Sequence, residues 1–170
     1  DSAAGGTAYS TGVRTFNGAI GVGPDSVPVP NVLEVARARG WATGIVSTSS
    51  VTHATPASFV AHVPARSQEF DIAKDIVASG VEVFLGGGVR WFDGAVRPDS
   101  TDLLAPVRST HTFVTSATEL AAVDPASTPR LAGLFAENGM PAAAERTPTL
   151  PDMTRAALEV LSRDRDGFFL

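Results

Sequence analysis

The chain has 170 residues, of which 44% are hydrophobic and 18% charged, which is enough apolar material for one core of ordinary domain size. The formal net charge of -5 at pH 7 argues against a nucleic-acid partner, because binding to a phosphate backbone needs a clustered positive face. The chain has no cysteine, which excludes disulfides and a thiol nucleophile, and no apolar run is long enough for a membrane span.

The spacing of apolar residues predicts helices that alternate with strands along the chain. In order, we expect a helix over 31–40, a strand over 41–49, helices over 55–62 and 70–80, strands over 81–85 and 111–116, a helix over 116–123, a strand over 131–136, a helix over 149–167 and the start of a strand over 167–170. Strands separated by helices predict an α/β fold, with a mostly parallel central sheet and helices on both faces. Such sheets place their sites at the carboxyl ends of the strands.

Local start signals support several of these helices. Asn31 precedes Glu34 by three residues, the spacing of a capping box. Thr55 is expected to cap the next helix, with Pro56 at its first position, where a missing N–H is harmless. The last predicted helix carries an apolar stripe of Leu150, Met153, Ala157, Leu158 and Leu161.

The first candidate site is the opening pair Asp1-Ser2. A serine at the start of a helix has its hydroxyl near backbone N–H groups and the positive end of the helix dipole, which together favour an anion. The alternative is that Asp1 and Ser2 only cap the helix. From these residues alone the alternative is favoured, since a serine without an adjacent base is a poor nucleophile.

The second candidate site lies in the stretch THATPASFVAHVPAR. His53 and Thr55 place nitrogen and oxygen atoms at a helix N-terminus, and Arg66 offers a planar, permanently charged fork for phosphate or carboxylate. The alternative is that Thr55 only caps the helix, His53 lies in a loop, His62 packs in the core and Arg66 is solvated. Taken one at a time, each of these alternatives is favoured.

Taken together, the motifs resemble those of alkaline phosphatases. The stretches DSAA..TA..TG..T.NG.IG, TG.V.T...THATPA.F.AH...R, V.LGGG, GLFA...MP and PTL..MT..A...L.....GFFL occur in the order and approximate spacing of that family, from Asp1 to Leu170. The resemblance implies the family's α/β fold and metal-dependent hydrolysis of phosphate monoesters through a phosphoserine intermediate. A sulfatase or phosphodiesterase of the same superfamily, and a non-catalytic structural or phosphate-binding piece, remain as alternatives.

The resemblance also implies a role for each candidate residue. Ser2 matches the nucleophile, which in the family is bound by zinc (Zn²⁺), and Arg66 matches the arginine that holds two phosphoryl oxygens. Asp1 matches a residue that positions this arginine, and Thr55 a ligand of a third metal, usually magnesium (Mg²⁺). His53 lies near that magnesium site, where family members differ; because nitrogen suits zinc better than magnesium, the metal there is left open.

The family's remaining zinc ligands have no match among these 170 residues, and the three histidines do not replace them. We therefore expect residues 1–170 to form one partial domain, an internal segment that is incomplete at both ends and inactive when isolated. The resemblance further implies a homodimeric parent protein in a periplasmic or extracellular setting, acting on phosphate monoesters and binding inorganic phosphate.

Overall fold

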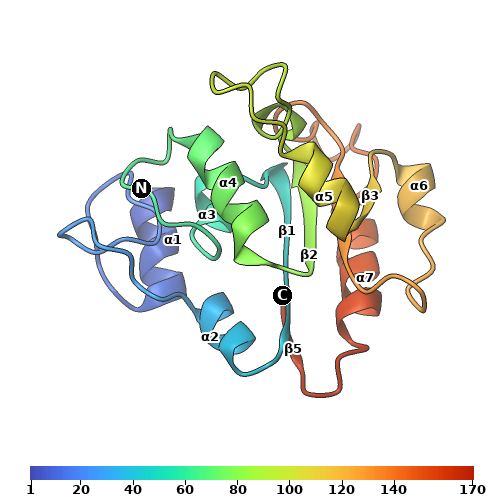
Figure 1. Cartoon of the computed structure of the whole chain (residues 1–170), viewed down its shortest axis with the longest axis horizontal. Helices are drawn as coiled ribbons and strands as arrows, with labels where there is room; N and C mark the ends of the chain where they lie inside the picture. The colour runs from blue at the N-terminus through green and yellow to red at the C-terminus, as the bar shows by residue number, and fades with distance from the viewer.

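Five strands form one parallel sheet in the order β3-β4-β2-β1-β5 (Figure 1). The computed structural model describes residues 1–170. Its strands are β1 (Ala42–Ser50), β2 (Val83–Gly87), β3 (Thr112–Val114), β4 (Leu131–Leu134) and β5 (Phe168–Phe169). The central strand β2 is buried along its whole length, as expected for a strand that is covered on both faces.

The helices divide between the two faces of this sheet. They are α1 (Ser2–Thr11), α2 (Val32–Ala38), α3 (Ala54–Ala57), α4 (Glu69–Ser79), the 3₁₀ helix η1 (Val89–Trp91), α5 (Leu104–Thr110), α6 (Ala117–Ala121) and α7 (Leu150–Leu161). Along β2, Phe84 packs into a core shared with α1 to α5, whereas Val83 and Leu85 pack into a core shared with α6 and α7. The predicted α/β fold with helices on both faces is confirmed.

The capping box predicted from Asn31 and Glu34 is confirmed, and a second one that was not predicted is present. Asn31 and Glu34 form a reciprocal capping box at the start of α2. At the start of α7, Thr149 and Asp152 form a second capping box. None of the helices combines the length and the apolar composition needed to cross a membrane.

The helix predicted over residues 55–62 is wrong in both its start and its length. Helix α3 has only four residues, and its N-cap is His53 instead of Thr55. The carbonyl of His53 accepts the N–H of Ala57 at 3.0 Å, which places Thr55 inside the first turn. After Ala57 the chain continues in tighter turns, and the Ser58 hydroxyl donates to the Ala54 carbonyl at 2.7 Å, a local contact that competes with helix continuation.

Two further differences concern the second half of the chain. Helix α5 was not predicted, because a helix of seven residues gives too little apolar periodicity to separate it from a loop; it begins where Asp102 accepts the N–H of Leu104 at 2.9 Å. Helix α7 ends at Leu161, well before residue 167. Within its predicted stripe, Leu150 and Leu158 are 43% and 40% exposed, and Val160 completes the buried face instead.

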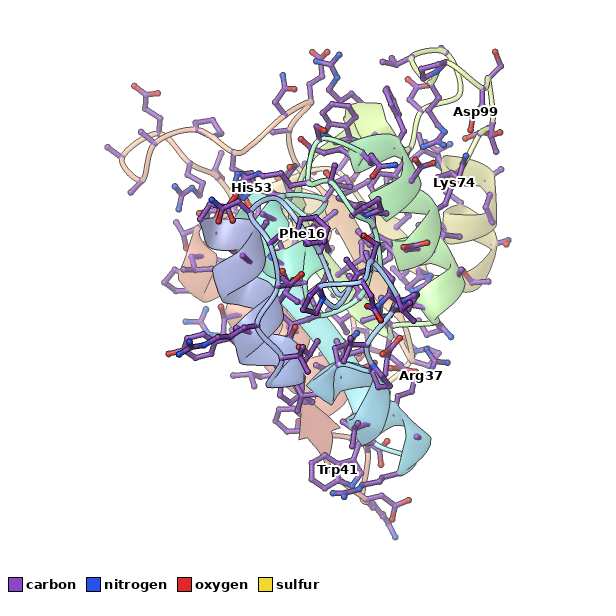
Figure 2. The ribbon with its side chains drawn as sticks, turned by 90° about the vertical axis from the view of Figure 1, so that its left-hand side faces the viewer. Phe16, Arg37, Trp41, His53, Lys74 and Asp99 are labelled. Carbon is purple, nitrogen blue, oxygen red and sulfur yellow. The ribbon has the colours of Figure 1, made fainter.

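The fold gathers the candidate residues at one end of the molecule. Strand β1 ends at Ser50 and leads directly into the segment that carries His53. The N-terminus lies toward the same end as the carboxyl end of β1 (Figure 1). Figure 2 shows His53 at the N-terminal end of α1, whereas Trp41, which precedes β1, lies at the opposite end. This placement agrees with the expectation that the site lies at the carboxyl ends of the strands.

Candidate active site

Ser2 is the first residue of α1 and is exposed at the helix N-terminus. The helix is held against the segment after β1 by Ser10, whose hydroxyl donates to the Ser58 carbonyl at 2.6 Å. Gly6 makes this approach close, because a Cβ there would lie 2.7 Å from the Ser58 hydroxyl oxygen. Small residues in α1 thus let the helix pack directly beside α3 while its N-terminus stays open.

Arg66 reaches Ser2 from a segment 64 residues away in the sequence. One guanidinium nitrogen, Nη1, donates to Ser2 Oγ at 2.6 Å, and Nη2 donates to His53 Nε2 at 2.9 Å. Because a guanidinium only donates, His53 Nε2 is the accepting nitrogen and the ring carries its proton on Nδ1. The fold therefore brings together three of the predicted site residues around one positive charge.

A further group, Glu69, holds the turn that carries His53. Its Oε2 atom accepts the hydroxyl of Ser50 at 3.0 Å and the hydroxyl of Thr52 at 2.5 Å. Thr52 is completely buried, so these contacts fix the turn between β1 and α3 from inside. Sequence reasoning missed Glu69, since its partners lie 19 and 17 residues away and no local pattern links them.

The whole chain matches one protein-family model, described as alkaline phosphatase, over residues 1–170. The chain belongs to the alkaline phosphatase family. It is 39% identical over 179 residues to alkaline phosphatase 3 of Bacillus subtilis, an alignment that covers 100% of this chain and 37% of that protein. The resemblance predicted from the motifs is confirmed.

Solved alkaline phosphatases share the fold. The enzyme from the Antarctic bacterium TAB5 matches with a TM-score of 0.89 at 39% identity, covering 99% of this chain and 49% of that one. The Thermus thermophilus enzyme matches with a TM-score of 0.93 at 38% identity, covering 100% and 37%. A TAB5 variant with a histidine replaced by aspartate has magnesium bound in its M3 site and matches with a TM-score of 0.85 at 38% identity, covering 99% and 49%. The chain thus spans less than half the length of these relatives.

Asp1 makes no hydrogen bond to Arg66 in this structure. Its carboxylate accepts the N–H of Ala4 at 3.0 Å and so caps α1, and it forms no ion pair with Arg66. The reason is the direction of the side chain, which turns back over the first turn of its own helix. Asp1 thus caps α1, and the side-chain partners of Arg66 are Ser2 and His53; the role of Asp1 in positioning Arg66 stays a prediction.

Thr55 makes no hydrogen bond to Ser2, Arg66 or His53. It is exposed in α3 and lines a cavity of about 230 Å³ that also contacts Ser47, Phe59 and β5.

The chain's own side chains do not by themselves fit a metal ion. No three His, Asp or Glu side chains lie close enough together to hold one. Zinc sites are usually completed by three or four nitrogen, oxygen or sulfur ligands, and Ser2, Thr55 and His53 provide no such set together.

The cluster around Arg66 is suited to bind an oxyanion next to a hydroxyl. Ser2 is exposed, and the guanidinium that donates to its oxygen favours the negative charge that a nucleophilic oxygen develops. The open N–H groups at the start of α1 add donors on the same side. The arrangement can therefore hold a phosphoryl group within reach of Ser2.

Proposed function

We propose that the protein containing this chain hydrolyses phosphate monoesters in a metal-dependent reaction, with Ser2 as the nucleophile. The observation that carries the proposal is the 2.6 Å hydrogen bond from Arg66 to the exposed oxygen of Ser2 at a helix N-terminus. Membership of the alkaline phosphatase family supports it.

In this reaction Ser2 Oγ attacks phosphorus, the ester P–O bond breaks, and the alcohol leaves with a proton while the phosphoryl group is transferred to the serine. Water then cleaves the phosphoserine to release inorganic phosphate and restore the hydroxyl. Arg66 binds two phosphoryl oxygens through its fork, and His53 holds the outer guanidinium nitrogen in place. Asp1 keeps the first turn of α1 formed.

Zinc and magnesium are the metals of the proposal. Ser2 is proposed to contact zinc, and Thr55 to supply an oxygen ligand to magnesium, a hard cation that prefers oxygen. The magnesium in the M3 site of the TAB5 variant supports the presence of such a site in a relative. Because this chain's side chains do not complete either site, the metals carry no step in the reaction described above.

The test is turnover of an aryl phosphate, an aryl sulfate and a phosphodiester by the complete gene product that carries this chain. We expect the phosphate monoester to be preferred, and a phosphoenzyme to be trapped at acidic pH on the peptide that contains Ser2. Ser2→Ala should abolish the label and most of the turnover. Faster turnover of the sulfate or the diester would contradict the substrate class, and a label that survives Ser2→Ala would contradict the nucleophile.

A second candidate is phosphate binding without turnover, which the lack of a complete metal-ligand set favours for this chain taken alone. Calorimetric titration with inorganic phosphate, with and without added zinc, separates the two. Binding that needs no metal and is accompanied by no hydrolysis would support the second candidate.

The proposals for the oligomeric state and the cellular location of the complete protein rest on the family resemblance. We propose a homodimer in a periplasmic or extracellular setting, which light scattering and cell fractionation of the complete gene product would test.

A further inference from the structure

The imidazole of His62 lies between two hydrogen-bond acceptors. Its Nδ1 is 2.6 Å from the carbonyl oxygen of Gly21, and its Nε2 is 2.8 Å from Oε1 of Glu34. A neutral imidazole donates from one nitrogen only, which would leave the other facing an acceptor at close range. Both contacts are satisfied together when the ring is a doubly protonated imidazolium.

The charges around His62 favour this protonated form. Glu34 on α2 contacts the ring, and Asp75 on α4 accepts the backbone N–H of His62 at 2.9 Å. Burial lowers the pKa of His62, but the Gly21 carbonyl, Glu34 and Asp75 together raise that pKa above its usual value. Burial in turn raises the pKa of Asp75. Glu34 and Asp75 are the charged groups that face His62, and both are acidic.

Gly21, on one side of the ring, is tied to the helix that carries the nucleophile. Its N–H donates to Thr7 Oγ1 at 3.0 Å, and the same hydroxyl donates to the Ala19 carbonyl at 3.0 Å. Gly21 has φ +59, and a Cβ there would lie 2.1 Å from the Ala61 carbonyl oxygen and 2.8 Å from His62 Nδ1. Only glycine allows the loop to pass this close to the ring. His62 therefore contacts a loop that is bonded to α1.

The same loop is tied to the backbone of Arg66. Ile20 and Val63 exchange two hydrogen bonds of 2.9 Å, and the N–H of Arg66 donates to the Gly18 carbonyl at 2.7 Å. The loop over 18–21 thus binds the nucleophile helix through Thr7 and the arginine segment through Gly18 and Ile20.

We infer that His62, in its protonated form, is a positioning residue that keeps Arg66 beside Ser2. Loss of the proton from His62 then weakens oxyanion binding at the site. The inference rests on the proposed function. His62 touches neither Ser2 nor Arg66, so it acts through the loop over 18–21. A protonated ring donates to Gly21 and Glu34 at once, whereas a neutral ring donates to only one of them. Because the charged carboxylate of Glu34 is the stronger acceptor, the single proton stays on Nε2, the contact to Gly21 is lost and the loop that both site residues share loosens.

The first experiment measures the protonation of His62 in the complete gene product, by NMR of labelled histidine, with His62→Gln to assign the signal. We expect both ring nitrogens of His62 to carry protons at neutral pH, and Glu34→Gln to shift its titration toward lower pH. His111 is the matched internal control, because it is also half-buried but burial lowers its pKa. A His62 that is neutral at pH 7, or that titrates below His111, overturns the inference.

The second experiment measures the dissociation constant of inorganic phosphate against pH for wild type, His62→Gln and His111→Gln. Because the ionisation of phosphate affects wild type and variants equally, the ratio of their dissociation constants at each pH does not depend on it. We expect His62→Gln to weaken binding about tenfold near pH 6 and to match wild type once His62 has lost its proton, because a hydrogen bond to a charged group contributes roughly this much. His111→Gln should follow wild type throughout.

The outcomes separate this inference from the proposed function. If wild type binds no phosphate at any pH, the proposed function fails, whatever the NMR shows. If wild type binds phosphate and folded His62→Gln has the same pH profile, the inference about His62 fails and the proposed function stands. Should His62→Gln not fold, Glu34→Gln serves as the second variant, and an unchanged profile there overturns the inference equally.

Discussion

Replacement of Arg66 by alanine tests the geometry on which the site depends. In the structure the guanidinium donates two side-chain hydrogen bonds, to Ser2 Oγ at 2.6 Å and to His53 Nε2 at 2.9 Å, and both donors would turn to a bound phosphoryl group. Arg66→Ala removes this fork and leaves the exposed hydroxyl of Ser2 in place. We therefore expect weaker phosphate binding and slower turnover with an intact fold.

The size of the effect follows from the hydrogen bonds that the substitution removes. Hydrogen bonds to charged groups contribute about 1.5 to 3 kcal/mol each, and part of this contribution is offset because the site opens to water. A net decrease of about 2 kcal/mol in binding free energy corresponds to a dissociation constant for phosphate that is roughly 30-fold higher. Arg66→Lys keeps the charge but not the planar fork, so it should recover only part of this affinity.

The assay is calorimetric titration with inorganic phosphate, together with kcat and KM for an aryl phosphate, on the complete gene product. Arg130→Ala is the matched control: Arg130 is also half-buried, and its Nη2 donates to two acceptors, the carbonyls of Gly80 and Val81 at 2.8 and 3.0 Å. It directly precedes β4 and so lies at the amino end of the parallel strands, whereas the site lies at their carboxyl end. If Arg66→Ala binds phosphate as wild type does, Arg66 is not part of the site and the reasoning from its hydrogen bond to Ser2 is refuted.

Three further predictions concern the surroundings of the site and the stability of the fold. His53→Asp should increase magnesium binding and the activation by added magnesium, because a carboxylate suits a hard cation; unchanged metal content would contradict it. Thr52→Val should lower the free energy of unfolding by about 1 to 2 kcal/mol, measured by urea denaturation, because the buried hydroxyl no longer donates to Glu69. Arg97 holds the pKa of Asp99 well below its usual range, so this pair contributes stability above about pH 4 that is lost as the pH falls further. The melting temperature, measured from neutral to acidic pH, should fall less for Asp99→Asn than for wild type. An equal decrease in both proteins would exclude the pair as a source of acid sensitivity.

The Lys74–Asp99 contact shows why such a pair escapes sequence reasoning. The Lys74 ammonium lies 2.8 Å from Asp99 (Figure 2), and Arg97, whose side chain is fully buried, donates to the same carboxylate at 2.9 Å. Arg97 also donates to the carbonyls of Phe70 and Trp91. The sequence does not predict these contacts of Arg97, because its partners become neighbours only when α4 packs against η1.

The sequence by itself determined the features whose causes lie within a few residues. The capping box of Asn31 and Glu34 could be predicted because both partners belong to one helical turn. The alternation of helices and strands predicted the parallel sheet, since the spacing of apolar residues indicates which face of each helix or strand is buried. The order of the motifs, and not any single residue, identified the family and with it the expected roles of Ser2 and Arg66.

Only the tertiary structure decided which side chains meet. Ser2 and Arg66 are 64 residues apart, and their contact depends on α1 packing beside α3 and on the loop over 18–21 binding both segments. The pairing of Thr52 with Glu69 likewise follows from directions and distances that a linear pattern does not contain. Contacts of this kind arise when separate elements share one core, so the site geometry is a property of the packed molecule.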